Sequence, residues 1–365
     1  MKSLTSWFVL IVSIAVIVSS CAKSDDSKTA TTSSTDNTTS SSDDSSDDSS
    51  DNSTSTSDNS TSTSDNSSSA NPEVFVAFGF NGTIVRSTDN GTTWDNVTSP
   101  DVGYYDAAFG NSTYVIVGYH GTIVRSTDNG TTWDNATDDI SSWDNATGKY
   151  LWNVAFGNNT FVAVYRYTGD IIRSTDNGAS WDNATTDNST NNTLWGVAFG
   201  NNTFVAVGNS GNIVRSTDNG ASWDNATTDN STTVRLRRVH FGNNTFVAVG
   251  ASGNIVRSTD NGSTWDNATN SNTASLNGVT FGNNTFMAVG DYGNIVKSTD
   301  NGSTWDNATR PFTSDWTSRV AFGNNTFVVT GRNGTILTSS DNGTSWDNRT
   351  SAAATGSLAG ITFSE

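Results

Sequence analysis

Short apolar runs alternate with polar turns through residues 71–365. The stretch 194–227, LWGVAFGNNTFVAVGNSGNIVRSTDNGASWDNAT, is rich in Val, Ile, Phe and Trp at its apolar positions and follows no helical period. Such runs, bounded by Gly, Asn and Ser, are typical of β-strands. The pattern predicts four strands in this stretch, LWGVAF, TFVAVG, NIVRST and SWDNA, joined by the turns GNN, NSG and DNG.

The stretch is one copy of a repeat. The pattern S-x-D-x-G-x-x-W begins at Ser87, Ser126, Ser174, Ser216, Ser258, Ser298 and Ser339. Successive spacings are 39, 48, 42, 42, 40 and 41 residues, and the long one contains a partial extra copy, SSWDNAT, at 141–147. These spacings match the length of one four-stranded propeller blade.

The two ends of the repeat region complement each other. The segment EVFVAFGFNGTIV, from Glu73, aligns with the second strand of the unit, and LAGITFSE, from Leu358, aligns with the first. We therefore expect residues 358–364 to supply the missing first strand of the first blade and to cover two open sheet edges. The predicted fold is all-β, a closed seven-bladed β-propeller spanning 71–365. An open solenoid of the same hairpins is the alternative, but it leaves the matching ends unexplained.

The repeated motif resembles the Asp box, or BNR repeat, of sialidases, sortilin-type receptors and photosystem II assembly-factor propellers. The resemblance implies a structural hairpin between the third and fourth strands of each blade, not a catalytic site. In the first copy we expect Asp89 to accept hydrogen bonds from turn amides, Gly91 to adopt a positive φ, and Trp94 to cover the hairpin. The equivalent structural residues are Asp128, Asp176, Asp218, Asp260, Asp300 and Asp341, with Trp133, Trp181, Trp223, Trp265, Trp305 and Trp346.

Charge narrows the range of ligands. The chain has 18 Lys and Arg against 36 Asp and Glu, and residues 71–365 keep 15 against 26, a balance of −11. An acidic domain repels phosphate backbones, so we expect no nucleic-acid partner. The TDNG and WDN segments lack the spacing and the distant Glu of an EF-hand loop, and we expect neither a metal site nor a cofactor.

The first 70 residues predict export and anchoring. Residues 1–20 have the short apolar core of a signal peptide, and Val18-Ser19-Ser20-Cys21 resembles the lipobox of bacterial lipoproteins. The resemblance implies a lipid on Cys21, the only cysteine, and Ala22 after it implies sorting to the outer membrane. Residues 21–70 are almost wholly Ser, Thr, Asp and Asn, which predicts a disordered tether to the membrane.

The sequence lacks the residues that an enzymatic site of the sialidase type would need. A sialidase-like site would need an arginine triad, a Tyr nucleophile polarised by a Glu, and an Asp acid/base, but Glu73 and Glu365 stand at the ends of the folded region. The basic residues before the boxes repeat with the blades and indicate architecture: Arg86, Arg125, Arg173, Arg215, Arg257 and Lys297. The least repetitive acids, Asp106, Asp170, Asp291 and Asp315, show no pairing of the kind a glycosidase uses. We predict that the protein is not an enzyme.

The clues to function lie where the blades differ. The second and third positions of the first strand vary most: Tyr105-Asp106, Trp152-Asn153, Trp195-Gly196, Arg237-Arg238, Asn277-Gly278, Ser318-Arg319 and Ala359-Gly360. Equivalent positions lie on one ring, so an aromatic and basic arc near the central channel is predicted as a binding surface. A second variable set follows the second strand: Tyr119-His120, Tyr165-Arg166-Tyr167, Asp291-Tyr292 and Arg332. The alternative is that Trp152 and Trp195 only fill gaps between blades. His240 is expected to be a packed strand residue and His120 a solvated one.

The resulting functional prediction is a non-enzymatic envelope lipoprotein whose propeller binds a protein partner or assists a membrane complex. The photosystem II assembly-factor propellers are the nearest resemblance in size. A sialidase-like glycan hydrolase or a glycan-binding lectin is the alternative, and a surface spacer or adhesin is the third. The sequence leaves the oligomeric state open.

Overall fold

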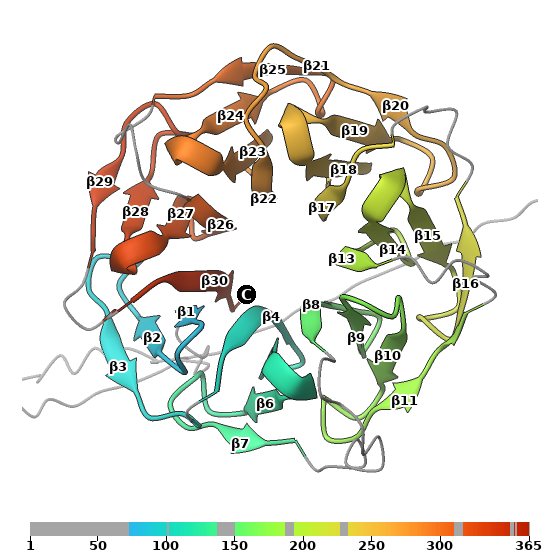
Figure 1. Ribbon diagram of the computed structural model, residues 1–365. Coiled ribbons are helices and arrows are strands. Elements are labelled where there is room, and N and C mark those ends of the chain that lie inside the picture. The colour runs from blue at the N-terminus through green and yellow to red at the C-terminus, as the bar shows by residue number, and fades with distance from the viewer. Residues whose placement is uncertain are drawn as a thin grey trace, which may run out of the picture. The chain divides into compact units, whose positions relative to one another are not determined.

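A computed structural model describes residues 73–100, 102–136, 150–186, 193–226, 233–309, 317–350, 354 and 356–364. Seven sheets stand around a central channel, with innermost strands of six or seven residues near the axis and outermost strands of two to four residues at the rim (Figure 1). The prediction of a seven-bladed β-propeller is confirmed. The signal peptide, Cys21, the tether, SSWDNAT and Asp315 lie outside the described residues. Within the described ranges, no helix is long and apolar enough to cross a membrane.

Each blade contains four main strands, ordered from the channel outward. The blade that joins the two ends of the repeat region has β30 (Leu358–Phe363), β1 (Phe75–Gly79), β2 (Ile84–Ser87) and β3 (Asp95–Val97). The next two have β4 (Tyr104–Gly110), β5 (Thr113–Gly118), β6 (Ile123–Ser126) and β7 (Asp134–Asn135), then β8 (Leu151–Gly157), β9 (Thr160–Tyr165), β10 (Ile171–Ser174) and β11 (Asp182–Asn183). The fourth has β13 (Leu194–Gly200), β14 (Thr203–Gly208), β15 (Ile213–Ser216) and β16 (Ser222–Asn225), extended at its edge by β12 (Thr185–Thr186).

The remaining blades follow the same order. They comprise β17 (Leu236–Gly242), β18 (Thr245–Gly250), β19 (Ile255–Ser258) and β20 (Asp266–Asn267); β22 (Leu276–Gly282), β23 (Thr285–Gly290), β24 (Ile295–Ser298) and β25 (Thr304–Asn307), with β21 (Thr269–Asn270) at its edge; and β26 (Thr317–Gly323), β27 (Thr326–Gly331), β28 (Ile336–Ser339) and β29 (Asp347–Asn348). Single 3₁₀ turns follow the second strands: η1 (Tyr119–Gly121), η3 (Asn209–Gly211), η4 (Ala251–Gly253), η5 (Asp291–Gly293) and η6 (Arg332–Gly334).

The core lies between blades rather than within them. The second strands, such as TFVAVG in β14, are buried along their whole length because both faces of each sheet contact a neighbouring blade. One hydrophobic cluster, for example, combines Val205 and Val207 of one blade with Leu236 and Phe246 of the next. This arrangement explains the nearly continuous apolar runs seen in the sequence.

The predicted closure of the ring is confirmed. Strand β30 pairs antiparallel with β1, with Phe75 opposite Phe363 and Ala77 opposite Ile361. Beyond the strand, the hydroxyl of Ser364 accepts a hydrogen bond of 2.7 Å from the backbone N–H of Val74. The last described residues therefore complete the sheet that the first ones begin, and the facing edges of β1 and β30 cover each other.

The first copy of the repeated S-x-D-x-G-x-x-W motif forms a hydrogen-bonded turn. The Asp89 carboxylate accepts hydrogen bonds from the Thr93 N–H at 2.8 Å and from the Ser87 hydroxyl at 2.8 Å. Gly91 has a φ of +77°, and its N–H donates to the Ser87 hydroxyl. The Trp94 indole N–H donates to the Gly91 carbonyl at 3.0 Å, so the ring lies over the hairpin. These polar contacts satisfy the groups of the turn.

A ring of phenylalanines seals the blades at the end of the inner strands. A Cβ added to Gly200 would lie 2.0 Å from Cγ of Phe241 on the next blade, and five of the other inner strands repeat this contact with the next phenylalanine. Only glycine allows so close an approach. The F-G at the end of six of the seven inner strands therefore packs each blade against the next.

Candidate functional site

Each inner strand carries a β-bulge at the same place. In β13, Leu194 pairs with Gly208 and Gly196 with Val207, so Trp195 is the extra residue. The equivalent bulge residues are Tyr105, Trp152, Arg237, Asn277, Ser318 and Ala359. A bulge bends the strand and re-aims a side chain. The position that varies most between the repeats is thus the one whose side chains the bulges gather around one end of the channel.

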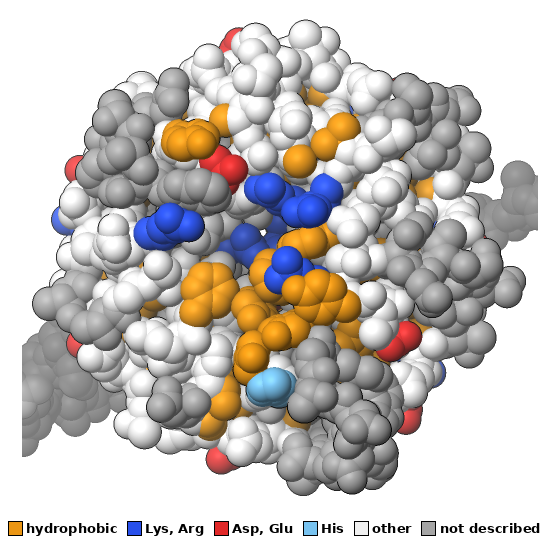
Figure 2. Space-filling view, viewed as in Figure 1, with side chains coloured by type: hydrophobic (Ala, Val, Ile, Leu, Met, Phe, Trp, Pro, Cys, Tyr) orange, Lys and Arg blue, Asp and Glu red, His pale blue; other side chains and the backbone are white. Residues whose placement is uncertain are grey.

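These bulge residues and the first residues of the neighbouring loops form what we term the mouth of the channel. The loop residues are Phe80, Tyr119, Arg166, Asn209, Ala251, Asp291 and Arg332. A hollow of about 100 Å³ at the mouth is lined by five bulge residues together with Phe80 and Arg319. Figure 2 shows hydrophobic and basic side chains gathered around the centre of this face, with acidic side chains mostly towards its edge.

Arg166 is held between two tryptophans. Its guanidinium carbon lies 4.4 Å from the ring centre of Trp152 and 4.3 Å from that of Trp195, and Tyr167 contributes a third ring at 4.9 Å. The two indoles meet edge to face, with ring centres 5.2 Å apart. Such cation–π contacts fix a guanidinium without neutralising its charge. Among the described residues, no carboxylate pairs with Arg166, and its Nε has no hydrogen-bond partner.

An aromatic row continues from this pair around the mouth. Ring centres are 4.5 Å apart between Trp152 and Tyr105, and 5.6 Å apart between Tyr105 and Phe80. Burial raises the pKa of Tyr105 to about 12, so its hydroxyl stays protonated. Phe80 is 51% exposed, which makes the row accessible from solvent.

Hydrogen bonds from the backbone and from side chains hold the loop residues in place. The Arg166 N–H donates to the Tyr150 carbonyl at 3.0 Å, and the Asn209 N–H donates to the Thr193 carbonyl in the same way. The Asn209 side chain then accepts from the Trp195 indole N–H at 2.8 Å and from Arg235 Nε at 3.1 Å. Arg235 also lies 4.7 Å from the Trp195 ring. The mouth is therefore built on side chains whose positions are fixed before any ligand arrives.

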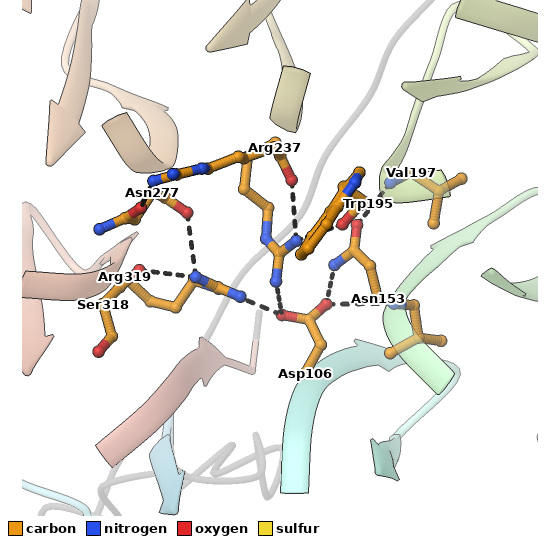
Figure 3. Close-up of polar contacts among 10 residues, drawn as sticks. Asp106, Asn153, Trp195, Val197, Arg237, Asn277, Ser318 and Arg319 are labelled. Atoms are coloured by element: carbon orange, nitrogen blue, oxygen red, sulfur yellow. Dashed lines mark hydrogen bonds and ion pairs between the residues drawn. The ribbon is translucent and has the colours of Figure 1, made fainter. Parts of the chain in front are cut away.

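A buried ionic network lies beneath the mouth (Figure 3). The Asp106 carboxylate lies 3.7 Å from Arg238 Nη2 and 3.8 Å from Arg319 Nε, and these residues come from three different blades. Asp106 also accepts hydrogen bonds from the Asn153 side chain and, at 3.1 Å, from the Val154 N–H. Asn153 in turn accepts from the Val197 N–H at 2.5 Å. We term Asp106, Asn153, Arg238 and Arg319 the clamp.

The arginines of the clamp bond to the backbone of the bulge residues. Arg238 Nη1 donates to the Trp195 carbonyl and, at 2.9 Å, to the Arg237 carbonyl. Arg319 Nη1 donates to the Asn277 carbonyl at 3.0 Å and to the Ser318 carbonyl at 2.7 Å. Four of the seven bulges are therefore tied to one buried network.

The channel continues below the clamp as a cavity of about 520 Å³. The four clamp residues line one end of the cavity, and the rest of its wall is mainly alanine, valine and the inner-strand phenylalanines, with His240, Thr280 and Thr362 as polar members. Burial lowers the pKa of His240 to about 4, so the imidazole is neutral at physiological pH. His240 is half-buried in the channel wall.

The structure places the predicted binding residues at three levels. Tyr105, Trp152, Trp195, Arg237, Arg166 and Tyr167 lie at the mouth, and they come together as one surface. Arg238, 5% exposed, and Arg319, whose side chain is 15% exposed, belong to the clamp, and Arg319 also lines the hollow at the mouth. Tyr165 is 1% exposed and packs in the core between two blades. His120 is exposed beside Tyr119, as expected for a loop residue.

Three mouth residues were missed by the sequence comparison. Phe80 stands at the blade position that Arg166 occupies, but it falls in the incomplete first repeat. Tyr150 and Arg235 directly precede their inner strands, three positions before the clamp level. Extending the comparison between blades by one residue before the strand would have identified both.

The candidate acids are engaged in polar contacts. Asp106 belongs to the clamp, and Asp291, which is 8% exposed, accepts from the Asn277 side chain at 2.8 Å and lies 4.0 Å from Arg237. Asp170 lies in a loop, where its carbonyl accepts from the Tyr165 N–H. Within the parts of the chain that the structure describes, no three His, Cys, Asp or Glu side chains come together as a metal site would require.

Comparisons with known proteins bear on the fold. No family model and no curated protein matches the chain. Among solved structures, the chain is similar to YCF48 bound to a D1 peptide, with 20% identity, a TM-score of 0.56, and coverage of 76% of this chain and 85% of that one. It is also similar to YCF48 from Cyanidioschyzon merolae, with 16% identity, a TM-score of 0.57 and coverage of 70% and 86%. A nidogen/laminin complex matches at 12% identity, a TM-score of 0.51 and coverage of 80% and 97%. At these identities the likeness establishes that the chain has the propeller fold of these proteins.

Proposed function

We propose that this protein is a non-enzymatic binding module, and that its propeller takes a carboxylate-bearing segment of a protein partner at the mouth of the channel. The observation that carries the proposal is the Arg166 guanidinium, fixed between Trp152 and Trp195 with no carboxylate partner among the described residues. A fixed guanidinium offers paired N–H donors that match a carboxylate.

The charge of the mouth supports an acidic ligand. Arg166, Arg235 and Arg237 lie there beside the carboxylate of Asp291, on a domain whose balance is −11. A basic patch on an acidic body attracts acidic segments and steers them away from the rest of the surface.

The aromatic row supports a peptide. Tyr, Trp and Arg are the residues that contribute most to protein–protein binding, and at the mouth they are adjacent, rigid and partly exposed. A protein of the same fold, YCF48, has been solved with a D1 peptide bound, and this supports a peptide as the ligand proposed here. The proposal extends to a role in assisting a membrane complex, as the resemblance to photosystem II assembly-factor propellers implies.

A peptide-display selection on the full chain tests the proposal. Selection of a random library should enrich acidic peptides, and Arg166→Ala should abolish the enrichment. The matched control is Arg257→Ala, which removes one of the repeated arginines away from the mouth. Enrichment that is equal in both variants contradicts the proposal.

The same protein should be run on a glycan array and in a sialidase assay. Binding or hydrolysis there, together with a blank peptide selection, would favour the carbohydrate interpretation. If the peptide selection, the glycan array and the sialidase assay are all negative, the interpretation as a surface spacer or adhesin is favoured.

We also propose that the propeller is held at the outer membrane by a lipid on Cys21 and a tether of residues 21–70. The lipobox-like Val18-Ser19-Ser20-Cys21 and Ala22 support this proposal. Membrane fractionation of the wild type and of Cys21→Ser provides the test, since the variant should leave the membrane fraction. Equal recovery of both from membranes would show that another feature holds the protein there.

A further inference from the structure

The clamp is asymmetric within a ring of near-identical blades. At the level of Asp106 the seven inner strands carry Asp106, Asn153 and two arginines, and the other three carry glycine, at Gly196, Gly278 and Gly360. Two of the glycines allow the arginine-bearing strands to come close: a Cβ on Gly196 would lie 3.0 Å from Cα of Arg238, and one on Gly278 would lie 3.1 Å from Cα of Arg319. The one carboxylate at this level thus faces two buried cations.

Ion pairs and hydrogen bonds connect Asp106 to most of the bulge residues of the mouth. Through Arg238 it reaches the carbonyls of Trp195 and Arg237, and through Arg319 it reaches those of Asn277 and Ser318. Through Asn153 it reaches the N–H of Val197, two residues after Trp195. Removing the negative charge takes away the counter-ion that Arg238 and Arg319 share, so the two guanidiniums are no longer held in one arrangement beneath the bulge carbonyls.

We propose that Asp106 is a positioning residue of the mouth, whose ionised carboxylate holds the bulge residues in their binding arrangement and whose protonation releases them. This inference rests on the proposed function for its effect on binding. Its effect on the geometry of the mouth does not depend on any ligand.

The titration range of Asp106 is suited to such a role. Burial raises the pKa of Asp106 to about 6, against the opposing effects of the Arg238 charge and the hydrogen bonds from Val154 and Asn153. The groups that face it are Arg238 from β17, Arg319 from β26 and the neutral Asn153 from β8. His240, two residues beyond Arg238, has a pKa lowered to about 4 and stays neutral over the same range.

Protonation of Asp106 does not by itself unfold the chain. Because its pKa is higher in the folded state than the ordinary value of 3.8, proton uptake between these two values favours the folded state. A change in the mouth near pH 6 is therefore separable from acid unfolding.

The test is a pH titration of backbone amides by NMR on the full chain. The N–H groups of Val154 and Val197 should shift with one midpoint near pH 6 in the wild type and in the control Asp224→Asn, which removes an exposed carboxylate on the outer strand β16. Asp106→Asn should remove the midpoint. A midpoint that survives in Asp106→Asn, or a flat wild-type profile, overturns the inference.

A second variant keeps the test decisive if Asp106→Asn fails to fold. Asn153→Ala removes the connection to Val197 and leaves both ion pairs in place. In this variant the Val154 amide should keep its midpoint and the Val197 amide should lose it. If Val197 still titrates near pH 6, the proposed path is wrong.

Binding provides the functional arm, with an acidic peptide from the display selection as the probe. On lowering the pH from about 7.5 to about 5.5, wild-type affinity should fall roughly 4-fold, because a carboxyl with a pKa of about 6 is only about one quarter ionised at the lower value while peptide carboxylates stay largely ionised. Asp106→Asn should bind weakly at both values. If the amides titrate as expected but binding does not depend on pH, the proposed effect of Asp106 on binding is wrong, while its effect on the geometry of the mouth is upheld. If binding does not need Arg166, the proposed function is wrong, while the inference about the geometry of the clamp is unaffected.

Discussion

The guanidinium of Arg238 lies 3.7 Å from the carboxylate of Asp106, although the two side chains come from inner strands three blades apart around the ring. This contact crosses the channel and separates the mouth from the cavity of about 520 Å³ below it. It is built from residues that break the repeat. The repeated residues form the ring, and the exceptions join distant blades across it.

The buried pair should contribute far more to stability than an exposed one. We expect Arg238→Ala to lower the free energy of unfolding by about 3–5 kcal/mol, because it leaves a buried carboxylate short of a counter-ion. The matched control is Arg349→Ala, which removes an exposed pair with Asp347 at 3.0 Å and should cost about 1 kcal/mol or less. Urea unfolding of both variants measures the difference, and similar losses would contradict the role of the clamp.

The seven copies of the S-x-D-x-G-x-x-W motif, which we call the boxes, should each stabilise their own turn. Asp260 accepts hydrogen bonds from the Thr264 N–H and hydroxyl and from the Ser258 hydroxyl, so Asp260→Ala should cost about 1–3 kcal/mol. Asp266→Ala, on the exposed outer strand of the same blade, should be nearly neutral. Chemical denaturation of the two variants checks the prediction, and an equally large loss for Asp266→Ala would refute it.

Acid should destabilise the boxes at low pH. Hydrogen bonds from the Ser345 side chain and backbone lower the pKa of Asp341 to about 2, against an ordinary value of 3.8. A lowered folded-state pKa gives stability that is present above the ordinary value and is lost as the pH falls through the folded value. Thermal melts should therefore decline mainly between these two values. A box variant such as Asp341→Asn should show a smaller decline over the same range, and an unchanged decline would contradict the assignment.

The glycines that pack against the circle of inner-strand phenylalanines should tolerate no added methyl group. Gly200→Ala places a Cβ against the Phe241 ring and should cost about 1–3 kcal/mol through overpacking. Combining it with Phe241→Ala removes the clash, so the double variant should be no less stable than Phe241→Ala alone. Additive losses in this cycle would show that the glycine serves another purpose.

The fold could be predicted from the sequence because the repeat is regular. The spacing of the boxes indicated the blade length, and the segments from Glu73 and Leu358 indicated the closure that β1 and β30 confirm. Local motifs were equally readable, since the contacts of Asp89, Gly91 and Trp94 all lie within one turn.

The candidate site was predictable only in part. Comparing blades identified the variable positions. It did not identify which of two adjacent residues faces the mouth, because the β-bulge sets the direction of each side chain. Arg237 and Arg238 are neighbours in sequence, yet one reaches the mouth and the other the clamp. The partnership of Asp106 with Arg238 and Arg319 depends on the curvature of the closed ring, which no local pattern specifies.

The central claim is that Arg166 receives a carboxylate, and a double-mutant cycle on one complex tests it most directly. Calorimetry would measure the affinity of a selected acidic peptide and of its Glu→Gln or Asp→Asn counterpart for the wild type and for Arg166→Ala. A charge-assisted hydrogen bond predicts a loss of about 10- to 100-fold when either partner is removed, with little further loss when both are removed. Losses that simply multiply, or an Arg166→Ala protein that binds as tightly as the wild type, would contradict the account.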